Sequence, residues 1–135
     1  MHHQGAMTIT SFRDLLVWQR AMTLTERVYE LTNALPKSEQ YGLASQMKRA
    51  AVSIPSNIAE GHTRKTGHFL EHLNTASGSN SELQTQLELT HRLKLLSRSD
   101  VDPVAEEAAV VGRLLHALAR AVARQGKKAD RIPNP

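Results

Sequence analysis

Residues 68–72 read His-Phe-Leu-Glu-His, and their types and spacing suggest chemistry more directly than any other segment. They fit the H-x-x-E-H pattern of some zinc peptidases, in which two imidazoles on one helix face bind zinc beside a carboxylate base. A catalytic zinc normally has a third protein ligand. Glu88 and His91 lie on the same expected helix, but about five turns or roughly 27 Å further along. A third ligand would have to come from another helix, so His68 and His72 predict adventitious metal binding at most.

Other catalytic patterns are missing from the sequence. The absence of cysteine excludes disulfides, zinc–thiolate sites and thiol nucleophiles. The chain contains no glycine-rich phosphate loop, no G-x-S-x-G elbow and no paired-carboxylate di-iron motif. The scattered carboxylates are most simply solvated or paired with bases between helices: Glu60, Glu71, Glu82 and Glu88. We therefore predict that the protein is not an enzyme and has no catalytic residues, no metal and no cofactor.

Positive charge is the second chemical feature, since 17 Lys and Arg against 13 Asp and Glu give a net charge of +4. Two zones hold the candidate phosphate contacts, Lys48, Arg49, Arg64 and Lys65 in the first and Arg120, Arg124, Lys127 and Lys128 in the second. Basic zones are typical of nucleic-acid binding. The alternative is that +4 on 135 residues is ordinary and that basic helix ends merely complement the helix dipole. No aromatic platform is free for base stacking, so contacts would be mainly with phosphates.

Amphipathic helices must position these residues, because the chain is 40% hydrophobic but only 4% aromatic. The first helix is expected over residues 12–35, capped by Thr10 or Ser11. Its main apolar stripe has spacings of three and four: Val17, Ala21, Leu24, Val28, Leu31 and Leu35. A second apolar face carries Trp18, Met22 and Tyr29. Two apolar faces predict a helix that is central in a bundle or lies partly at a subunit interface.

The second helix is expected from Ser38 to a natural stop at Gly61. Pro55 predicts a kink or break within it, because proline removes one backbone hydrogen bond and pushes against the preceding turn. The short polar side chains around the proline could satisfy the freed backbone groups: Ser53, Ser56 and Asn57.

The third helix is expected over residues 67–97 with Thr66 as its cap, and it contains a waist of weak helix formers at residues 74–81. Its apolar spacing continues through the waist and is joined late by Leu89, Leu93 and Leu96. Small residues such as Gly78 would let another helix approach closely. Asn80 would lie at a core or interface position, where a polar residue often fixes register or oligomeric state.

The fourth helix is expected to begin at Asp102 as cap, with Pro103 in its first turn, and to end at Gly126. The chain then divides into a tag remnant and N-terminal arm (residues 1–11), a bundle (residues 12–125) and a mobile basic tail (residues 126–135). We predict an all-α, antiparallel up-down four-helix bundle. No apolar run approaches the 18 residues of a membrane span, so we expect a cytoplasmic protein.

Residues 12–19 read FRDLLVWQ, residues 45–61 read SQMKRAAVSIPSNIAEG, and Gly78-Ser79 is followed by Glu82-Leu83. These three segments resemble the four-helix bundle proteins of the 23S rRNA intervening-sequence protein family. The resemblance spans residues 12–122, and its most specific part is residues 49–61.

This resemblance implies an up-down bundle that assembles into a homopentameric ring, which agrees with the two-faced first helix and the small-residue waist. The candidate interface residues are Trp18, Met22, Tyr29, Gly78 and Asn80. Similar proteins are accessory factors of diversity-generating retroelements, where a basic pentamer engages nucleic acid and a reverse transcriptase. The family has no established enzymatic activity. This sequence departs from the family in Asn80 and Ser81, which replace apolar or small residues, and in its histidine pair.

The polar residues of the specific segment have two interpretations. Either they repair the backbone around Pro55 while Glu60 pairs with a neighbouring base, or Asn57 and Glu60 line a surface for a partner. For the whole chain, we expect an oligomeric nucleic-acid-binding accessory protein that contacts RNA or DNA phosphates. The alternative is a protein-interaction scaffold that does not bind nucleic acid.

Overall fold

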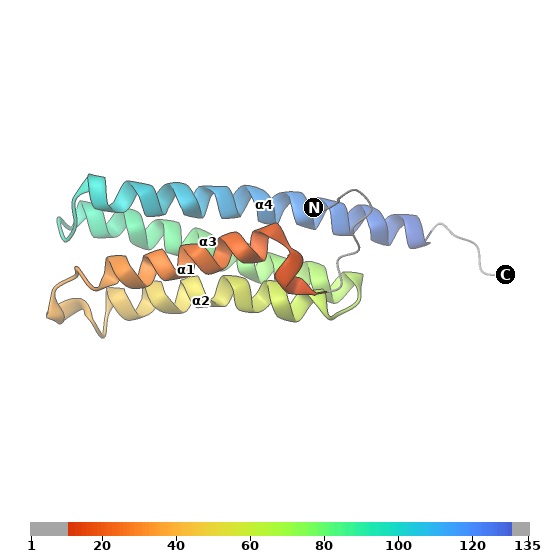
Figure 1. Ribbon diagram of the computed structural model, residues 1–135, viewed down its shortest axis with the longest axis horizontal. Helices are drawn as coiled ribbons and strands as arrows, with labels where there is room; N and C mark the ends of the chain where they lie inside the picture. Colours follow the sequence, from red (N-terminus) through yellow and green to blue (C-terminus); the bar gives the residue numbers. More distant parts are fainter. Residues whose placement is uncertain (1–10, 131–135) are drawn as a thin grey trace, which may run out of the picture.

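A computed structural model describes residues 11–130 of the protein. Its elements are η1 (Phe12–Asp14), α1 (Leu16–Thr32), η2 (Lys37–Glu39), α2 (Leu43–His62), α3 (Thr66–Arg92) and α4 (Arg98–Asp130). The four α-helices lie side by side in alternating directions (Figure 1). Helices α1 and α3 each pack against both α2 and α4, while α1 and α3 lie diagonally across the bundle. The predicted all-α four-helix bundle is confirmed, and the described residues form no strand.

The core follows the apolar stripes of the sequence. Val17, Ala21, Leu24 and Val28 are buried on α1, as their spacing predicts. The other helices contribute the remaining large buried side chains, including Met47, Ile54, Ile58, Leu73, Leu83, Leu87, Val111 and Leu115. Each such side chain stabilises the fold by about 1.5–3 kcal/mol through its removal from water.

Helix α1 is shorter than the sequence suggests. Leu15 is extended, with ψ of 125°, so residues 12–14 form a separate 3₁₀ turn capped by the Ser11 hydroxyl. Helix α2 begins at Leu43 rather than at Ser38, because η2 and the irregular backbone of Gly42 precede it.

Of the kink or break predicted at Pro55, the break does not occur, because α2 is continuous from Leu43 to His62. The carbonyl of Ala51, which Pro55 leaves without its helical donor, accepts a hydrogen bond from Thr25 Oγ1 of α1 at 3.1 Å. Asn57 Nδ2 donates to the carbonyl of Ser53 at 2.8 Å. The freed carbonyl is therefore satisfied from the neighbouring helix, whereas Asn57 bonds to a carbonyl that Pro55 does not free, so no local side chain that we expected is seen to satisfy Ala51.

Helix α3 runs through the small-residue waist, as predicted, but ends at Arg92 rather than at Ser97. Lys94 has a φ of 60°, which turns the chain into the left-handed region. The amide of Leu95 then donates to the carbonyl of Thr90, and that of Lys94 to the carbonyl of His91. These two bonds form a Schellman motif, which ends the helix without the usual glycine. At the other end of α3, Thr66 lies inside the helix and the capping position belongs to Lys65.

Helix α4 extends beyond both predicted ends. It begins at Arg98, and its first turn is capped by Ser97 Oγ, which accepts from the amide of Asp100 at 3.2 Å; Asp102 is not the cap. It continues through Gly126 to Asp130. Residues 131–135, and the side chain of Lys128, lie outside the described part of the chain. None of the described helices is long and apolar enough to span a membrane.

Candidate nucleic-acid interface

The two basic zones of the sequence meet at one end of the bundle. The loop between α2 and α3 lies beside the C-terminal turns of α4 (Figure 1). A Cβ atom on Gly126 would stand only 2.7 Å from Thr66 Cγ2, so the backbone of α4 closely approaches the Thr66 side chain there. Arg64 and Lys65 therefore lie at the same end as Arg124 and Lys127, and we call these four residues the basic end.

Most of the candidate phosphate contacts have no acidic partner. Ion pairs among the described residues engage Arg20 with Glu107, Arg92 with Glu88, and Arg98 with Glu88 and Asp102. Among the candidates whose side chains the structure describes, only Arg64 has a described acidic partner, Glu60 Oε1 at 3.4 Å. Both side chains of that pair are about half exposed, so it contributes little and can be exchanged for a phosphate. The six exposed or half-exposed candidates outside ion pairs are Lys48, Arg49, Lys65, Arg120, Arg124 and Lys127.

The first predicted set is not one continuous patch. Lys48 lies over the ring of Tyr29, with Nζ 5.1 Å from the centroid, and so faces α1. Arg49 instead lines a cavity with Ser79 and Glu82 of α3. Arg49 lies thirteen residues before His62, the last residue of α2, a rise of about 20 Å, and Arg64 follows in the loop. The structure thus separates Lys48 and Arg49 from Arg64 and Lys65 and places the latter beside the second zone.

A chain of polar contacts joins α2 to α3, and we call its five members the polar seam: Ser53, Asn57, Glu60, His72 and Ser79. The hydroxyls of Ser53 and Ser79 are 2.8 Å apart, and Asn57 Nδ2 donates to Ser53 Oγ at 3.1 Å. His72 Nδ1 lies 3.0 Å from Asn57 Oδ1 and 3.8 Å from Glu60 Oε2. The structural interpretation of Asn57 and Glu60 is therefore supported, because both hold the two helices together.

The seam passes the closest approach of the two helices, at Gly61. A Cβ atom there would lie 2.7 Å from His72 Cβ and 2.9 Å from Phe69 Cδ1. Gly61 is therefore a contact residue of α2 rather than its stop.

The two histidines of the H-x-x-E-H motif face different surroundings. His72 is engaged in the seam, whereas His68 is exposed and lies 3.6 Å from Glu71 Oε2. Within the described part of the chain, no three His, Asp or Glu side chains are grouped to hold a metal ion.

An apolar groove lies between α1 and α2. It has a volume of about 370 Å³ and is lined by Trp18, Met22, Thr25, Val52, Pro55, Ser56 and Ala59. Met22 and Val52 are each 41% exposed in the single chain, so a docking partner would bury additional apolar surface. Tyr29, also proposed as an interface residue, is exposed on the same helix beneath Lys48.

The waist residues do not share one role. Asn80 is only 3% exposed, and its Nδ2 donates to the carbonyl of Ala108 on α4 at 2.9 Å. Its assignment to a subunit interface was wrong, because this side chain lies in the core between α3 and α4. Gly78 is exposed, and a Cβ atom added to it would meet nothing within 4 Å.

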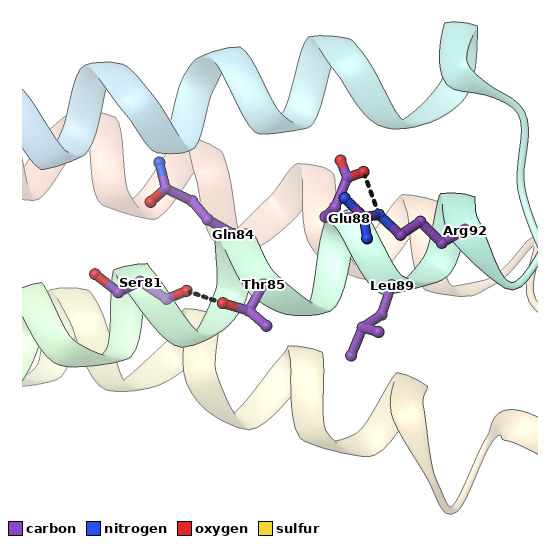
Figure 2. A pocket seen from close by; sticks show the side chains of 6 residues that line it. All are labelled: Ser81, Gln84, Thr85, Glu88, Leu89 and Arg92. Atoms are coloured by element: carbon purple, nitrogen blue, oxygen red, sulfur yellow. Dashed lines mark hydrogen bonds and ion pairs between the residues drawn. The ribbon is translucent and has the colours of Figure 1, made fainter.

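A shallow hollow of about 490 Å³ lies on the outer face of α3, and Figure 2 shows the six side chains that line it. They are Ser81, Gln84, Thr85, Glu88, Leu89 and Arg92. Hydrogen bonds from Arg98 and then Arg92 hold the pKa of the Glu88 carboxyl below its usual value. All six lining side chains come from α3, so no second element supplies groups that could hold a ligand from the opposite side. Leu89 and Leu93, expected to continue the core stripe, are 42% and 61% exposed.

Sequence reasoning missed the α3 side of the seam. The sequence does indicate one polar face on α2, because polar residues recur there at spacings of three and four: Gln46, Arg49, Ser53, Asn57 and Glu60. Their partners on α3 depend on the register of the two helices, which no pattern within one helix specifies.

Comparison with known proteins agrees with this architecture. The chain is similar to the solved structure of a protein of unknown function from the S23 ribosomal protein family of Bacteroides thetaiotaomicron, with a TM-score of 0.73. The two are 21% identical, over 78% of this chain and 96% of the other, a likeness that concerns the fold. No curated protein matches the chain. Residues 13–117 match the 23S rRNA-intervening sequence protein family. The four-helix bundle described above therefore belongs to the 23S rRNA-intervening sequence protein family.

Proposed function

We propose that the protein is a non-enzymatic, oligomeric nucleic-acid-binding accessory factor that contacts RNA or DNA phosphates through the basic end. The observation that carries this proposal is the convergence of Arg64, Lys65, Arg124 and Lys127 from two segments of the chain. Three of the four have no acidic partner among the side chains that the structure describes, so they can release counterions from a phosphate backbone on binding.

Assembly would strengthen this weak contact. Each additional subunit repeats the basic end, and linked weak sites bind a polyanion with much higher avidity than one site alone. The apolar groove between α1 and α2 supports self-association, because it leaves Met22 and Val52 partly exposed in the single chain. We place the subunit contact there.

The test is a salt titration of binding to a structured RNA and to duplex DNA. The variant Lys65→Gln/Arg124→Gln/Lys127→Gln removes three unpaired charges from the basic end. The matched control, Arg27→Gln/Lys37→Gln/Lys94→Gln, removes three charges that have no ion pair at the opposite end of the bundle. We expect the first variant to bind at least about tenfold more weakly at low salt and to reduce the slope of log K against log salt by roughly 2–3.

The control should stay within about threefold of the parent protein, because nonspecific charge effects fall off within a Debye length. Absence of binding by the parent protein at low salt, or equal losses in both variants, contradicts the proposal.

A second candidate function is a scaffold that recruits another protein. The apolar groove favours it, because hydrophobic and aromatic surface of this kind is typical of interface cores. The two functions differ in salt dependence, because a protein partner in the groove would not be held by the charges of the basic end. Removing those charges should leave its binding unchanged, whereas Met22→Glu should release it.

A further inference from the structure

The cavity between α2 and α3 contains opposite charges that do not pair with each other. It has a volume of about 420 Å³ and is lined by Gln46, Arg49, Ala50, Ser53, Ser79 and Glu82. That volume lies within the range of about 300–1,000 Å³ usual for small-ligand sites. Among the described residues, neither Arg49 nor Glu82 takes part in an ion pair. Both charged groups are therefore available to a ligand that enters the cavity.

The rest of the lining is already organised. The hydroxyls of Ser53 and Ser79 bond to each other at 2.8 Å, and Ser53 Oγ also accepts from Asn57. The lining groups that remain free to form hydrogen bonds with a ligand are the N–H donors of the Arg49 guanidinium and the Gln46 amide, and the acceptor oxygens of the Glu82 carboxylate. A matching ligand must present two hydrogen-bond donors next to one or more acceptors.

Guanine has this arrangement of groups. Its N1–H and its N2 amino group form a pair of donors suited to a carboxylate, while O6 and N7 are the acceptors that arginine commonly binds. Adenine and cytosine each present a single amino group on their reading edges and so satisfy the carboxylate less well. We propose that the cavity between α2 and α3 is a binding site for a guanine base, with Glu82 accepting from N1–H and N2–H and Arg49 donating to O6.

The position of the cavity suggests how an RNA would reach it, and to that extent the inference rests on the proposed function. The polar seam leads along α2 from the cavity to Glu60, and Arg64 follows at the basic end. The helical rise from Arg49 to His62 at the end of α2 is about 20 Å, and Arg64 follows two residues later. A short single strand can therefore place an unstacked base in the cavity while its phosphates lie near Arg64 and Lys65, and unstacked bases are the usual targets of sequence-specific RNA recognition.

Fluorescence anisotropy with two labelled RNA octamers tests the site. One octamer is all uridine, and the other has a single central guanosine. We expect the parent protein to bind the guanosine octamer at least about fivefold more tightly, the lower end of the discrimination given by a bidentate base contact. Glu82→Gln should abolish this preference while leaving affinity for the uridine octamer within twofold, because the carboxamide replaces one of the two acceptor oxygens with an amino group, which is a donor and cannot pair with a guanine donor. Glu106→Gln is the matched control, since Glu106 is exposed on α4, has no ion pair and lies outside the cavity.

Guanosine monophosphate added as competitor distinguishes a base within RNA from a free nucleotide. If the monophosphate alone binds the parent protein and binds Glu82→Gln more weakly, while neither octamer binds, the guanine site stands and the proposed function fails. If both octamers bind equally well to the parent protein, the guanine site is refuted and the proposed function stands. Loss of the preference in Glu106→Gln to the same extent as in Glu82→Gln also refutes it.

Discussion

Gly61 and Gly78 both lie inside helices, yet the structure requires glycine at only one of them. At Gly61 the helices α2 and α3 approach so closely that a Cβ atom would lie 2.7 Å from His72 Cβ. At Gly78 the same atom would enter open space. Glycine lowers helix stability relative to alanine by about 0.5–1 kcal/mol. At residue 78 no packing benefit within the chain offsets this cost, because a side chain there would meet no other atoms.

Gly61→Ala should lower the free energy of unfolding by about 1–3 kcal/mol, because the added methyl group overpacks the α2–α3 contact. Gly78→Ala should raise it by about 0.5–1 kcal/mol through helix propensity. Urea denaturation of both variants at one fixed protein concentration measures the two changes. Destabilisation by Gly78→Ala, together with a smaller assembly in solution, would contradict this and show that a neighbouring subunit approaches residue 78.

At the scale of elements, the sequence predicted which helices form but not where each one ends. Apolar spacings of three and four were sufficient for the four helices and for most of the core, since burial of one face determines that pattern. The ends of α3 and α4 were missed because a lysine with positive φ ends one helix, while the other continues through Gly126 against Thr66. Likewise, the polar residues that α2 contributes to the seam could be recognised from their spacing. The residues that α3 contributes could not, because they depend on the register in which the two helices pack.

The continuity of α2 through Pro55 depends on another element, and a double-mutant cycle tests this. Thr25 has one hydroxyl proton, which lies between the carbonyls of Ala21 at 2.8 Å and Ala51 at 3.1 Å. Thr25→Val should therefore lower the free energy of unfolding by about 1 kcal/mol, because it leaves the Ala51 carbonyl unpartnered. In a Pro55→Ala background, residue 55 again donates to Ala51, so the same substitution should cost clearly less.

Calorimetric or urea unfolding of the four proteins of the cycle gives the coupling between the two sites. Equal costs of Thr25→Val in both backgrounds would show that the hydroxyl does not compensate for the proline.

At the scale of the whole molecule, different surfaces hold the apolar groove and the basic end. The groove lies along α1 and α2, while the basic end is formed by the α2–α3 loop and the end of α4. Copies of the chain that associate through the groove, as proposed, would still present their basic ends to a polyanion.

Met22→Glu should weaken the proposed assembly, because it buries a charge in an apolar contact that cannot solvate it. In sedimentation velocity at micromolar concentration, we expect the parent protein to sediment as an oligomer and Met22→Glu as smaller species. Tyr41→Glu is the control, since Tyr41 is 99% exposed and lies outside the groove. A monomeric parent protein, or a Met22→Glu variant that sediments like the parent, would rule out the groove as a subunit contact.

The up-down connectivity also has a consequence for how fast the chain reaches its native state. Three of the four helix interfaces join helices that are consecutive in sequence, so their formation requires the closure of short loops only. The interface between α1 and α4 is the exception, and its Arg20–Glu107 pair spans 87 residues. A topology dominated by local contacts folds in microseconds to milliseconds. Once synthesis is complete, the bundle therefore spends little time with its apolar stripes exposed to other chains.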